Sequence, residues 1–237
     1  MVEHALAEAS QALEGRRAED ILRWAADRFG GRLGFATGFG VEGCVLVDLI
    51  GRLGLAVDVF TLDTGLLFPE TYDLWKRLEA HAGITIRAVR PAQTVAEQAA
   101  AHGDALWARD PDACCRLRKV EPLAGAVVGL DAWISAIRRD QTAERASATI
   151  VERDRRHGIV KINPLVGWSI KDVWRHVHDH SVPYNPLHDQ GYPSIGCQPC
   201  TSPVAEGEDP RAGRWRGQAK RECGLHLPVV NPQENTQ

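Results

Sequence analysis

The sequence has no run of about 20 apolar residues, which is the length that a membrane-spanning helix needs. Its first 26 residues lack the basic start and unbroken apolar core of a signal peptide, and they carry five acidic side chains instead. A net charge of only −3 gives no general reason to expect binding to nucleic acid or membranes. We therefore predict a cytoplasmic protein without a nucleic acid or membrane partner.

The chain also lacks a Ser/Gly-rich linker, a low-complexity stretch and an internal repeat. An apolar content of 44% and a charged content of 25% are ordinary for a globular protein. After residue 183 the chain becomes rich in proline, glycine and charge, which predicts loops and a tail. We expect a single α/β domain over residues 1–205 and a flexible C-terminal tail over residues 206–237.

Apolar patterning predicts strands and helices in alternation. Strands are expected at residues 32–37, 56–62, 84–89, 131–137 and 159–162. Helices are expected before residue 26, after residue 43, over residues 69–81, and from residue 170 to about 180 with Ser169 as N-cap. This order predicts a mostly parallel, doubly wound sheet. The sequence does not decide between a monomer and a homo-oligomer.

Three loops that follow predicted strands are candidates for ligand binding. The first is a glycine-rich turn at residues 38–43 between a strand and a helix, an arrangement that holds phosphate groups. The others are residues 63–65 and 138–141, and all three loops should share the rim at the carboxyl ends of the strands. Lys and Arg residues gather near the cysteine-bearing segments. This favours an anionic small molecule there, although solvated surface charge is the better explanation for several of them.

Six cysteines in a cytosolic chain indicate metal or redox chemistry before disulfides. Cys114 and Cys115 are adjacent, and Cys197 and Cys200 form a C-x-x-C pair. Zinc prefers chelating cysteines about two to four residues apart, whereas a [4Fe–4S] cluster accepts each thiolate on a different iron. The spacing favours the cluster, with a small buried apolar role as the alternative for either adjacent cysteine and as the sufficient explanation for Cys44.

Cys223 is left for another role. Basic neighbours and a histidine three residues later favour its nucleophilic thiolate form, and Glu222 opposes it. Lys119 follows Cys115 by one helical turn. If Asp112 caps a helix there, Lys119 stacks above the cysteine pair and balances its charge. Taken alone, Lys119 fits better as an ordinary surface lysine, and Cys223 alone is weak evidence for a nucleophile.

A series of strings resembles the assimilatory adenylyl-sulfate (APS) reductases, the iron–sulfur branch of the PAPS/APS reductase family, over most of the chain beyond residue 35. The strings are LDTG at 62–65, FPETY at 68–72, CC at 114–115, RKVEPL at 118–123, RRDQ at 138–141, KINPL at 161–165 and PYNPL at 183–187. The most specific are GYPSIGCQPCT at 191–201, RAGRW at 211–215 and ECGLH at 222–226. The resemblance implies an α/β fold of the PP-loop (adenine nucleotide alpha-hydrolase-like) type that binds a nucleotide.

The resemblance also implies an activity: thioredoxin-dependent reduction of adenosine 5′-phosphosulfate to sulfite and AMP, which supplies sulfite for cysteine synthesis. Cys223 matches the cysteine that attacks the substrate and becomes S-sulfocysteine, and thioredoxin or a glutaredoxin-like reductant then releases sulfite. The ligands of a [4Fe–4S] cluster match Cys114, Cys115, Cys197 and Cys200. That cluster is expected to shape and polarise the substrate site rather than to carry electrons.

The substrate-binding residues follow from the same resemblance. The nucleotide contacts match Gly38, Phe39, Gly40, Leu62, Asp63, Thr64, Gly65 and His226, and the phosphosulfate contacts match Lys119, Arg145, Arg211 and Arg214. The glycine turn departs from the usual family string, S-F-G-A-E-D, because it lacks the serine and the aspartate. Thr37, one residue earlier, offers a hydroxyl instead.

Three alternatives stay open from the sequence. A 3′-phosphoadenylyl-sulfate (PAPS) reductase shares the fold and the tail cysteine but generally lacks the cluster cysteines, whereas a reductase of both nucleotides can carry them. A nucleotide-cleaving ligase or sulfurylase of the same α/β type leaves Cys223 without a role. A zinc-stapled binding module uses the same four cysteines.

Overall fold

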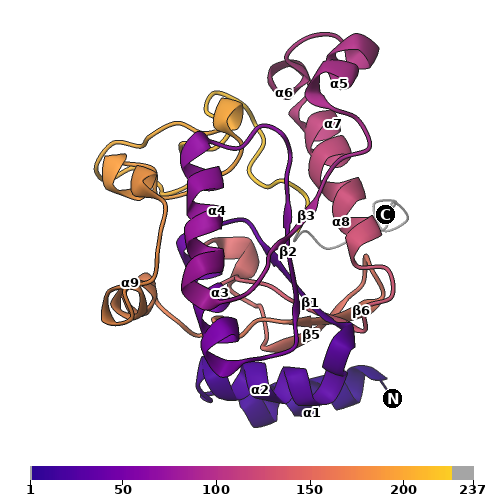
Figure 1. Ribbon diagram of the computed structural model, residues 1–237, viewed down its shortest axis with the longest axis vertical. Helices are drawn as coiled ribbons and strands as arrows, with labels where there is room; N and C mark the ends of the chain where they lie inside the picture. The colour runs from indigo at the N-terminus through magenta and orange to yellow at the C-terminus, as the bar shows by residue number, and fades with distance from the viewer. Residues whose placement is uncertain (1, 226–237) are drawn as a thin grey trace, which may run out of the picture.

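The computed structural model describes residues 2–225 and shows one sheet with helices on both of its faces (Figure 1). The sheet has six strands in the order β3-β2-β1-β4-β6-β5. Their bounds are β1 Leu33–Thr37, β2 Asp58–Leu62, β3 Arg87–Val89, β4 Ala132–Ile134, β5 Val151–Asp154 and β6 Ile159–Ile162. Every neighbouring pair is parallel except β5 with β6. The prediction of a mostly parallel α/β sheet is confirmed.

Alternation along the strands decides which helices each side chain meets. The helices are α1 Val2–Leu13, α2 Ala18–Phe29, α3 Val41–Leu53, α4 Pro69–Ala82, α5 Val95–His102, α6 Leu106–Arg109, α7 Pro111–Cys115, α8 Glu121–Ala126 and α9 Ile170–Asp179. Val59 and Ile134 belong to the large apolar cluster that α2, α3, α4 and α9 share. Their neighbours Phe60 and Trp133 pack with Leu123 of α8, because successive strand residues point to opposite faces. In Figure 1, α4 and α8 lie on opposite sides of the sheet.

The structure contains all five predicted strands, and it adds β5. The predicted strands at 84–89 and 131–137 are shorter in the structure, at Arg87–Val89 and Ala132–Ile134. Patterning missed β5 because its residues Val-Glu-Arg-Asp bury a single apolar side chain fully. The strand forms at the sheet edge, where it pairs with β6, and the Val151 N–H donates to the Ser10 hydroxyl of α1 at 3.2 Å.

Two helix starts follow the predicted chemistry. α9 begins after Ser169, whose hydroxyl accepts from the Asp172 N–H at 3.2 Å while the Asp172 carboxylate accepts from the Ser169 N–H at 2.8 Å. α4 begins at Pro69, where the missing N–H has no helical partner to lose. No helix within residues 2–225 is both long enough and apolar enough to cross a membrane.

A buried carboxylate joins three of the helices. Asp48 of α3 contacts the Nε2 atom of His81 on α4 at 2.9 Å and the Nε2 atom of His176 on α9 at 2.8 Å. Burial raises the pKa of Asp48, but the hydrogen bonds with His176 and His81 and the charge of Arg52 lower it by more, so it lies below its ordinary value. The ionised carboxylate therefore stabilises the packing of α3, α4 and α9.

We expect Asp48→Ala to lower the free energy of unfolding by about 1–3 kcal/mol at neutral pH, because both histidines lose a buried charged partner. Since the folded-state pKa lies below the unfolded value of about 3.9, this contribution is present above that value and is lost as the pH falls through the folded pKa. Urea unfolding at neutral and acidic pH measures the difference. Asp20→Ala, at an exposed helix ion pair, is the control and should change little. If the Asp48→Ala variant is as stable as the wild type, the prediction is contradicted.

Candidate active site

A cavity of about 180 Å³ lies beyond the carboxyl ends of β1 and β2. We call it the central cavity. Its lining includes eight of the predicted site residues, which are Gly38, Phe39, Leu62, Thr64, Lys119, Cys197, Arg214 and Cys223. Residues far apart in the chain thus meet in one space, and a nucleophilic thiol lies in it together with two cations.

The glycine-rich turn is shaped by Thr37 at the end of β1. The Phe39 N–H donates to the Thr37 hydroxyl at 3.2 Å, and Phe39 adopts a positive φ of 57°. A Cβ atom at Gly43 would lie 2.8 Å from that hydroxyl oxygen, so a side chain there would disturb the turn. Gly40 follows as the N-cap of α3 and offers no capping side chain. Thr37 therefore supplies the hydroxyl that residues 38–43 lack. This hydroxyl accepts a hydrogen bond from the backbone of the turn and so stabilises the shape of the turn.

In the loop after β2, some residues stabilise the turn and another lines the central cavity. The Asp63 carboxylate accepts hydrogen bonds from the Tyr72 hydroxyl at 2.8 Å, the Gly65 N–H at 3.2 Å and the Arg90 side chain at 3.1 Å. These bonds hold the turn, and neither Asp63 nor Gly65 lines the central cavity. Thr64 does line it, and its hydroxyl oxygen lies 3.3 Å from the Cys197 sulfur.

The two cysteine pairs of the sequence, 114–115 and 197/200, surround a second, smaller cavity, which we call the cysteine pocket. Its lining includes Cys114, Cys115, Cys197, Cys200 and Lys119. Lys119 and Cys197 line the central cavity as well, so the two spaces share a wall. An isolated bridge between Leu67 and Cys197 brings the C-x-x-C segment beside the loop after β2.

The helix before the adjacent cysteines starts earlier than expected. Asp110 is the N-cap of α7, and its carboxylate accepts from the Ala113 N–H at 2.9 Å. The expectation that Asp112 caps this helix is therefore wrong, because proline at residue 111 fits the first helical position. Lys119 lies in a π-helical turn, Arg116–Val120, which joins α7 to α8. It still reaches the wall of the cysteine pocket.

The thiols of this pocket differ in their electrostatics. Burial raises the pKa of Cys114 above its ordinary value, and it raises the pKa of Cys115 and of Cys200 to about 11. Burial acts on Cys197 in the same direction. However, the Lys119 charge, the Thr64 hydrogen bond and the Arg214 charge outweigh it, so the pKa of Cys197 is lowered. Cations stand beside the thiols, as an anionic thiolate site requires.

The donor set fits an iron–sulfur cluster. Four thiols line one pocket, and a cubane takes one thiolate on each of its irons. Within residues 2–225, no three His, Cys, Asp or Glu side chains are grouped in a way that could hold one metal ion. Cysteine thiolates are ligands of both iron–sulfur clusters and structural zinc ions, so the four side chains that line the pocket are of the required type.

The four candidate cations fall into two pairs. Lys119 and Arg214 line the central cavity, and neither forms an ion pair with a carboxylate of residues 2–225. The Arg214 Nε atom is buried without a hydrogen-bond partner. Arg145 and Arg211 lie outside that lining and contact the carboxylate of Glu222, each at 3.2 Å. An anion that enters the central cavity therefore meets Lys119 and Arg214.

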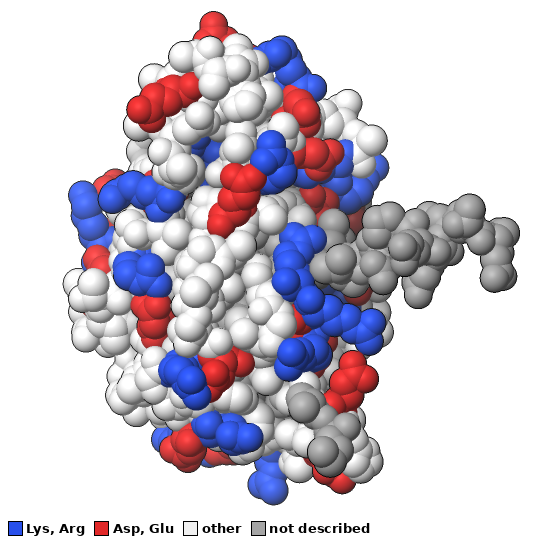
Figure 2. Space-filling model, turned by 90° about the vertical axis from the view of Figure 1, so that its right-hand side faces the viewer, with Lys and Arg blue, Asp and Glu red and all other residues white. Residues whose placement is uncertain are grey.

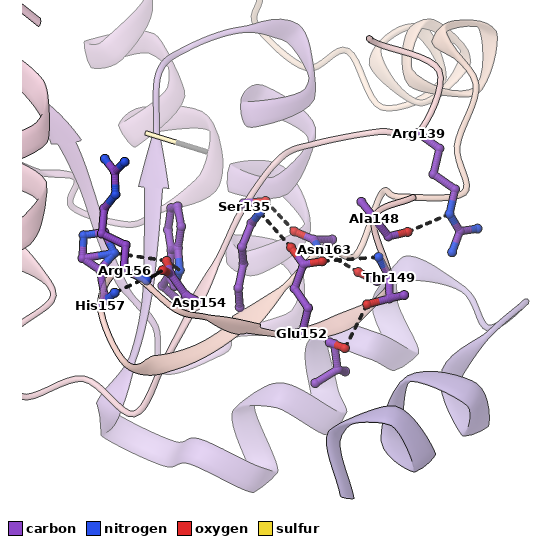
Figure 3. A network of polar contacts seen from close by, with 12 residues as sticks. Ser135, Arg139, Ala148, Thr149, Glu152, Asp154, Arg156, His157 and Asn163 are labelled. Atoms are coloured by element: carbon purple, nitrogen blue, oxygen red, sulfur yellow. Dashed lines mark hydrogen bonds and ion pairs between the residues drawn. The ribbon is translucent and has the colours of Figure 1, made fainter. Parts of the chain in front are cut away.

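Trp133 of β4 also lines the central cavity, and the sequence analysis missed it. Its indole N–H donates to the Asp154 carboxylate at 2.9 Å, which also accepts from the backbone N–H groups of Arg156 and His157. Figure 3 shows this network at the β5–β6 turn. The available signal was strand alternation, which places Trp133 on the face opposite to Ile134.

The same view shows how the loop after β4 is anchored (Figure 3). The Ser135 hydroxyl donates to the Asn163 side chain at 2.6 Å, and that side chain donates to the Thr149 carbonyl at 2.7 Å. Arg139 donates to the Ala148 carbonyl at 2.9 Å. The loop that carries Arg145 is thus fixed at both ends.

His226, a predicted nucleotide contact, lies outside the described residues.

A second hollow adjoins the central cavity on the outside. It has a volume of about 300 Å³, and its basic lining residues are Arg145, Arg153, Arg155, Arg156 and Lys161. Trp133 and Leu225 line both spaces and therefore separate them. Figure 2 shows a band of Lys and Arg side chains on the face that is turned to the right in Figure 1.

Comparison with known proteins points in one direction. Residues 32–203 match the family model described as phosphoadenosine phosphosulfate reductase domain. The chain is 49% identical over 207 residues to "Adenosine 5′-phosphosulfate reductase 1" of Bacillus subtilis, covering 87% of this chain and 89% of the relative. It is 48% identical over 215 residues to "Adenosine 5′-phosphosulfate reductase" of Geobacillus thermodenitrificans, covering 90% and 92%.

Solved structures agree with the sequence relatives. A phosphoadenylyl-sulfate reductase from Candida auris, crystallised as a phosphate complex, superposes with a TM-score of 0.75 at 33% identity and covers 84% of this chain and 96% of its own. A yeast FAD synthetase in complex with FAD superposes with a TM-score of 0.56 at 14% identity, covering 84% and 68%. The second likeness concerns the fold alone.

Proposed function

Because the chain belongs to the phosphoadenosine phosphosulfate reductase family, we propose that it reduces adenosine 5′-phosphosulfate to sulfite and AMP. One observation carries the proposal: Cys223 shares the central cavity with Lys119 and Arg214. A thiol beside two cations suits nucleophilic attack on an anionic sulfuryl group, because the cations neutralise charge on the oxygens that do not react.

The first step is a displacement at sulfur. The Cys223 thiolate attacks the sulfur atom of the sulfuryl group, an Sγ–S bond forms, and the bond from that sulfur to the phosphate oxygen breaks. AMP leaves with the electron pair of the broken bond, and S-sulfocysteine remains on the chain. Lys119 and Arg214 hold the anion, while the glycine-rich turn and Leu62 face the rest of the nucleotide.

The second step requires a dithiol reductant, and thioredoxin or a glutaredoxin-like protein supplies one. A thiolate of that partner attacks Cys223 Sγ, and sulfite leaves with the electron pair of the Sγ–S bond. The partner's second thiol then attacks the mixed disulfide, so Cys223 returns as a thiol and the partner becomes a disulfide. The two electrons come from the partner.

We also propose a cytoplasmic location. All six cysteines of the chain are free thiols, and thiols stay reduced in the cytoplasm.

Cys114, Cys115, Cys197 and Cys200 are the residues that would hold a [4Fe–4S] cluster. When bound there, the cluster would polarise the substrate site and would supply no electrons to the reaction. Lys119 is the residue that would link it to the substrate, because its side chain lines both the cysteine pocket and the central cavity.

Arg214→Gln should lower kcat/KM by about tenfold to a hundredfold, because it removes a buried charge-assisted contact with the sulfuryl or phosphate oxygens. Steady-state release of sulfite measures the effect. Arg216→Gln is the matched control, since Arg216 is exposed and pairs with Glu208 outside the cavity. Equal kcat/KM values for the two variants would remove Arg214 from the substrate site.

A reductase of 3′-phosphoadenylyl sulfate is the second candidate, because the Candida auris relative carries that name. Cleavage of the two nucleotides at equal concentration separates the candidates. We expect faster sulfite release from adenosine 5′-phosphosulfate, as the names of the bacterial relatives indicate.

The decisive experiment uses the protein and adenosine 5′-phosphosulfate without a reductant. Peptide mass spectrometry should find one added sulfite group on the peptide that contains Cys223, together with one equivalent of AMP in solution. An unmodified Cys223 peptide under these conditions would overturn the proposed function.

A further inference from the structure

We propose that Glu222 is a positioning residue for Cys223: its carboxylate, held between Arg145 and Arg211, keeps the thiol of the next residue in the central cavity. The inference rests on the proposed function, because it assigns a role toward the same nucleophile. We call Glu222, Arg145 and Arg211 the carboxylate latch.

The latch is a mostly buried three-part ion pair. Arg145 Nη2 lies 3.2 Å from Glu222 Oε1, and Arg211 Nη2 lies 3.2 Å from Glu222 Oε2. The exposed fractions of the side chains are 10% for Glu222, 13% for Arg145 and 21% for Arg211. Charges this well shielded interact more strongly than an exposed surface pair. Because adjacent Cα atoms are about 3.8 Å apart, fixing Glu222 restricts where Cys223 can lie.

Contacts on both sides of Cys223 support the same placement. Before it, Arg211 donates to the Arg221 carbonyl at 2.9 Å. After it, Arg156 of the β5–β6 turn donates to the Gly224 carbonyl, and Leu225 packs against the apolar cluster that contains Trp133. Leu225 also stands between the central cavity and the outer basic hollow. The described end of the tail is thus seated over the cavity, and the latch is its charged anchor.

The latch is connected to the glycine-rich turn by hydrogen bonds. Arg145 Nη1 donates to Gln141 Oε1 at 2.6 Å, and Gln141 Nε2 donates to Glu42 Oε1 at 2.9 Å. Glu42 belongs to the glycine-rich segment of residues 38–43 and lies in the first turn of α3. Arg138 donates to the same Glu42 oxygen at 3.0 Å. The orientation of Arg145 is therefore fixed by the segment that faces the substrate, and not by the tail alone.

The four cations differ in the groups that they contact. The family resemblance implied that both contact the phosphosulfate. In the structure they are paired with Glu222 and lie outside the central cavity, whereas Lys119 and Arg214 line it without a carboxylate partner in the described chain. The proposal therefore gives Arg145 and Arg211 the role of holding the nucleophile's segment in place, and their contact with the phosphosulfate stays a prediction.

The test compares Glu222→Gln with the matched variant Glu208→Gln, which changes an exposed glutamate of the same C-terminal segment. We expect Glu222→Gln to lower kcat, and the single-turnover rate of Cys223 sulfonation, by about tenfold while KM and the Kd of AMP stay within about twofold. Alkylation of Cys223 by a maleimide, followed on its peptide without any nucleotide, should be about tenfold faster. Glu208→Gln should match the wild type in every assay.

Arg145→Ala provides the second variant and should reproduce the effects of Glu222→Gln, and the double variant should be no worse than either single one. Thermal unfolding verifies that each variant is folded. Unchanged kcat and unchanged alkylation in Glu222→Gln would overturn the proposal. So would tighter AMP binding in that variant, since it would show that Glu222 competes with the ligand for the arginines.

The alkylation assay separates this inference from the proposed function. If adenosine 5′-phosphosulfate fails to sulfonate the wild-type Cys223, the proposed reaction is wrong. The alkylation rates of the two glutamate variants still report whether Glu222 holds the tail. If the wild type is sulfonated and Glu222→Gln is sulfonated at the same rate, only the latch is wrong.

Discussion

Cys223→Ser is expected to reduce sulfite release by about 10⁴-fold or more, because serine offers no thiolate to accept the sulfuryl group. The serine side chain is of similar size, so the central cavity and the carboxylate latch should keep their form. The measurement is sulfite release with thioredoxin and reductant in excess. AMP binding to the variant, followed by equilibrium dialysis, should remain close to that of the wild type.

Cys44→Ala is the control for the loss of a thiol. Cys44 is fully buried on α3, and its thiol lies 3.8 Å from the Phe39 carbonyl oxygen. This variant should retain most of the sulfite release. A Cys223→Ser protein that turns over at a rate near the wild type would exclude a covalent intermediate on the tail.

Cys197→Ala is expected to lose nearly all bound iron when the protein is purified without oxygen. Only three thiols of the cysteine pocket remain in this variant, and one iron of a cubane then has no protein ligand. Iron and acid-labile sulfide per chain, together with visible absorbance, measure the loss. Cys44→Ala again serves as the control, because Cys44 lies outside the pocket and should leave the iron content unchanged.

The same measurements decide the identity of the metal. A brown wild-type protein with iron and sulfide supports the cluster. A colourless protein that carries one zinc per chain supports the zinc-stapled alternative and contradicts the prediction. Full iron content in Cys197→Ala would show that the four-cysteine ligand set is wrong.

Local patterns in the sequence predicted most of the secondary structure that positions the site. The alternation of apolar strands with helices indicated a mostly parallel sheet, and the capping pair at Ser169 and Asp172 located α9. These predictions succeed because the signals are local: a cap needs residues three positions apart, and a strand needs its own alternation. β5 escaped because its stability comes from pairing with β6 and from packing against α1, which its own four residues do not encode.

The candidate site shows the same limit at longer range. The sequence alone identified the thiols and the cations of the site. However, the common wall that Lys119 and Cys197 give to the two cavities depends on segments almost 80 residues apart. The inclusion of Trp133 depends on which face of the sheet the cavity occupies.

By itself, the sequence determined the α/β class, the two cysteine pairs, the isolated tail cysteine and the basic residues around them. Only the tertiary structure decided how those basic residues are divided. Electrostatic energy depends on the distance between charges and on their shielding from water. The sequence alone gives neither the distances nor the shielding. Four similar cations therefore became two pairs only on folding, when Glu222 came within 3.2 Å of Arg145 and Arg211 and left Lys119 and Arg214 facing the cavity.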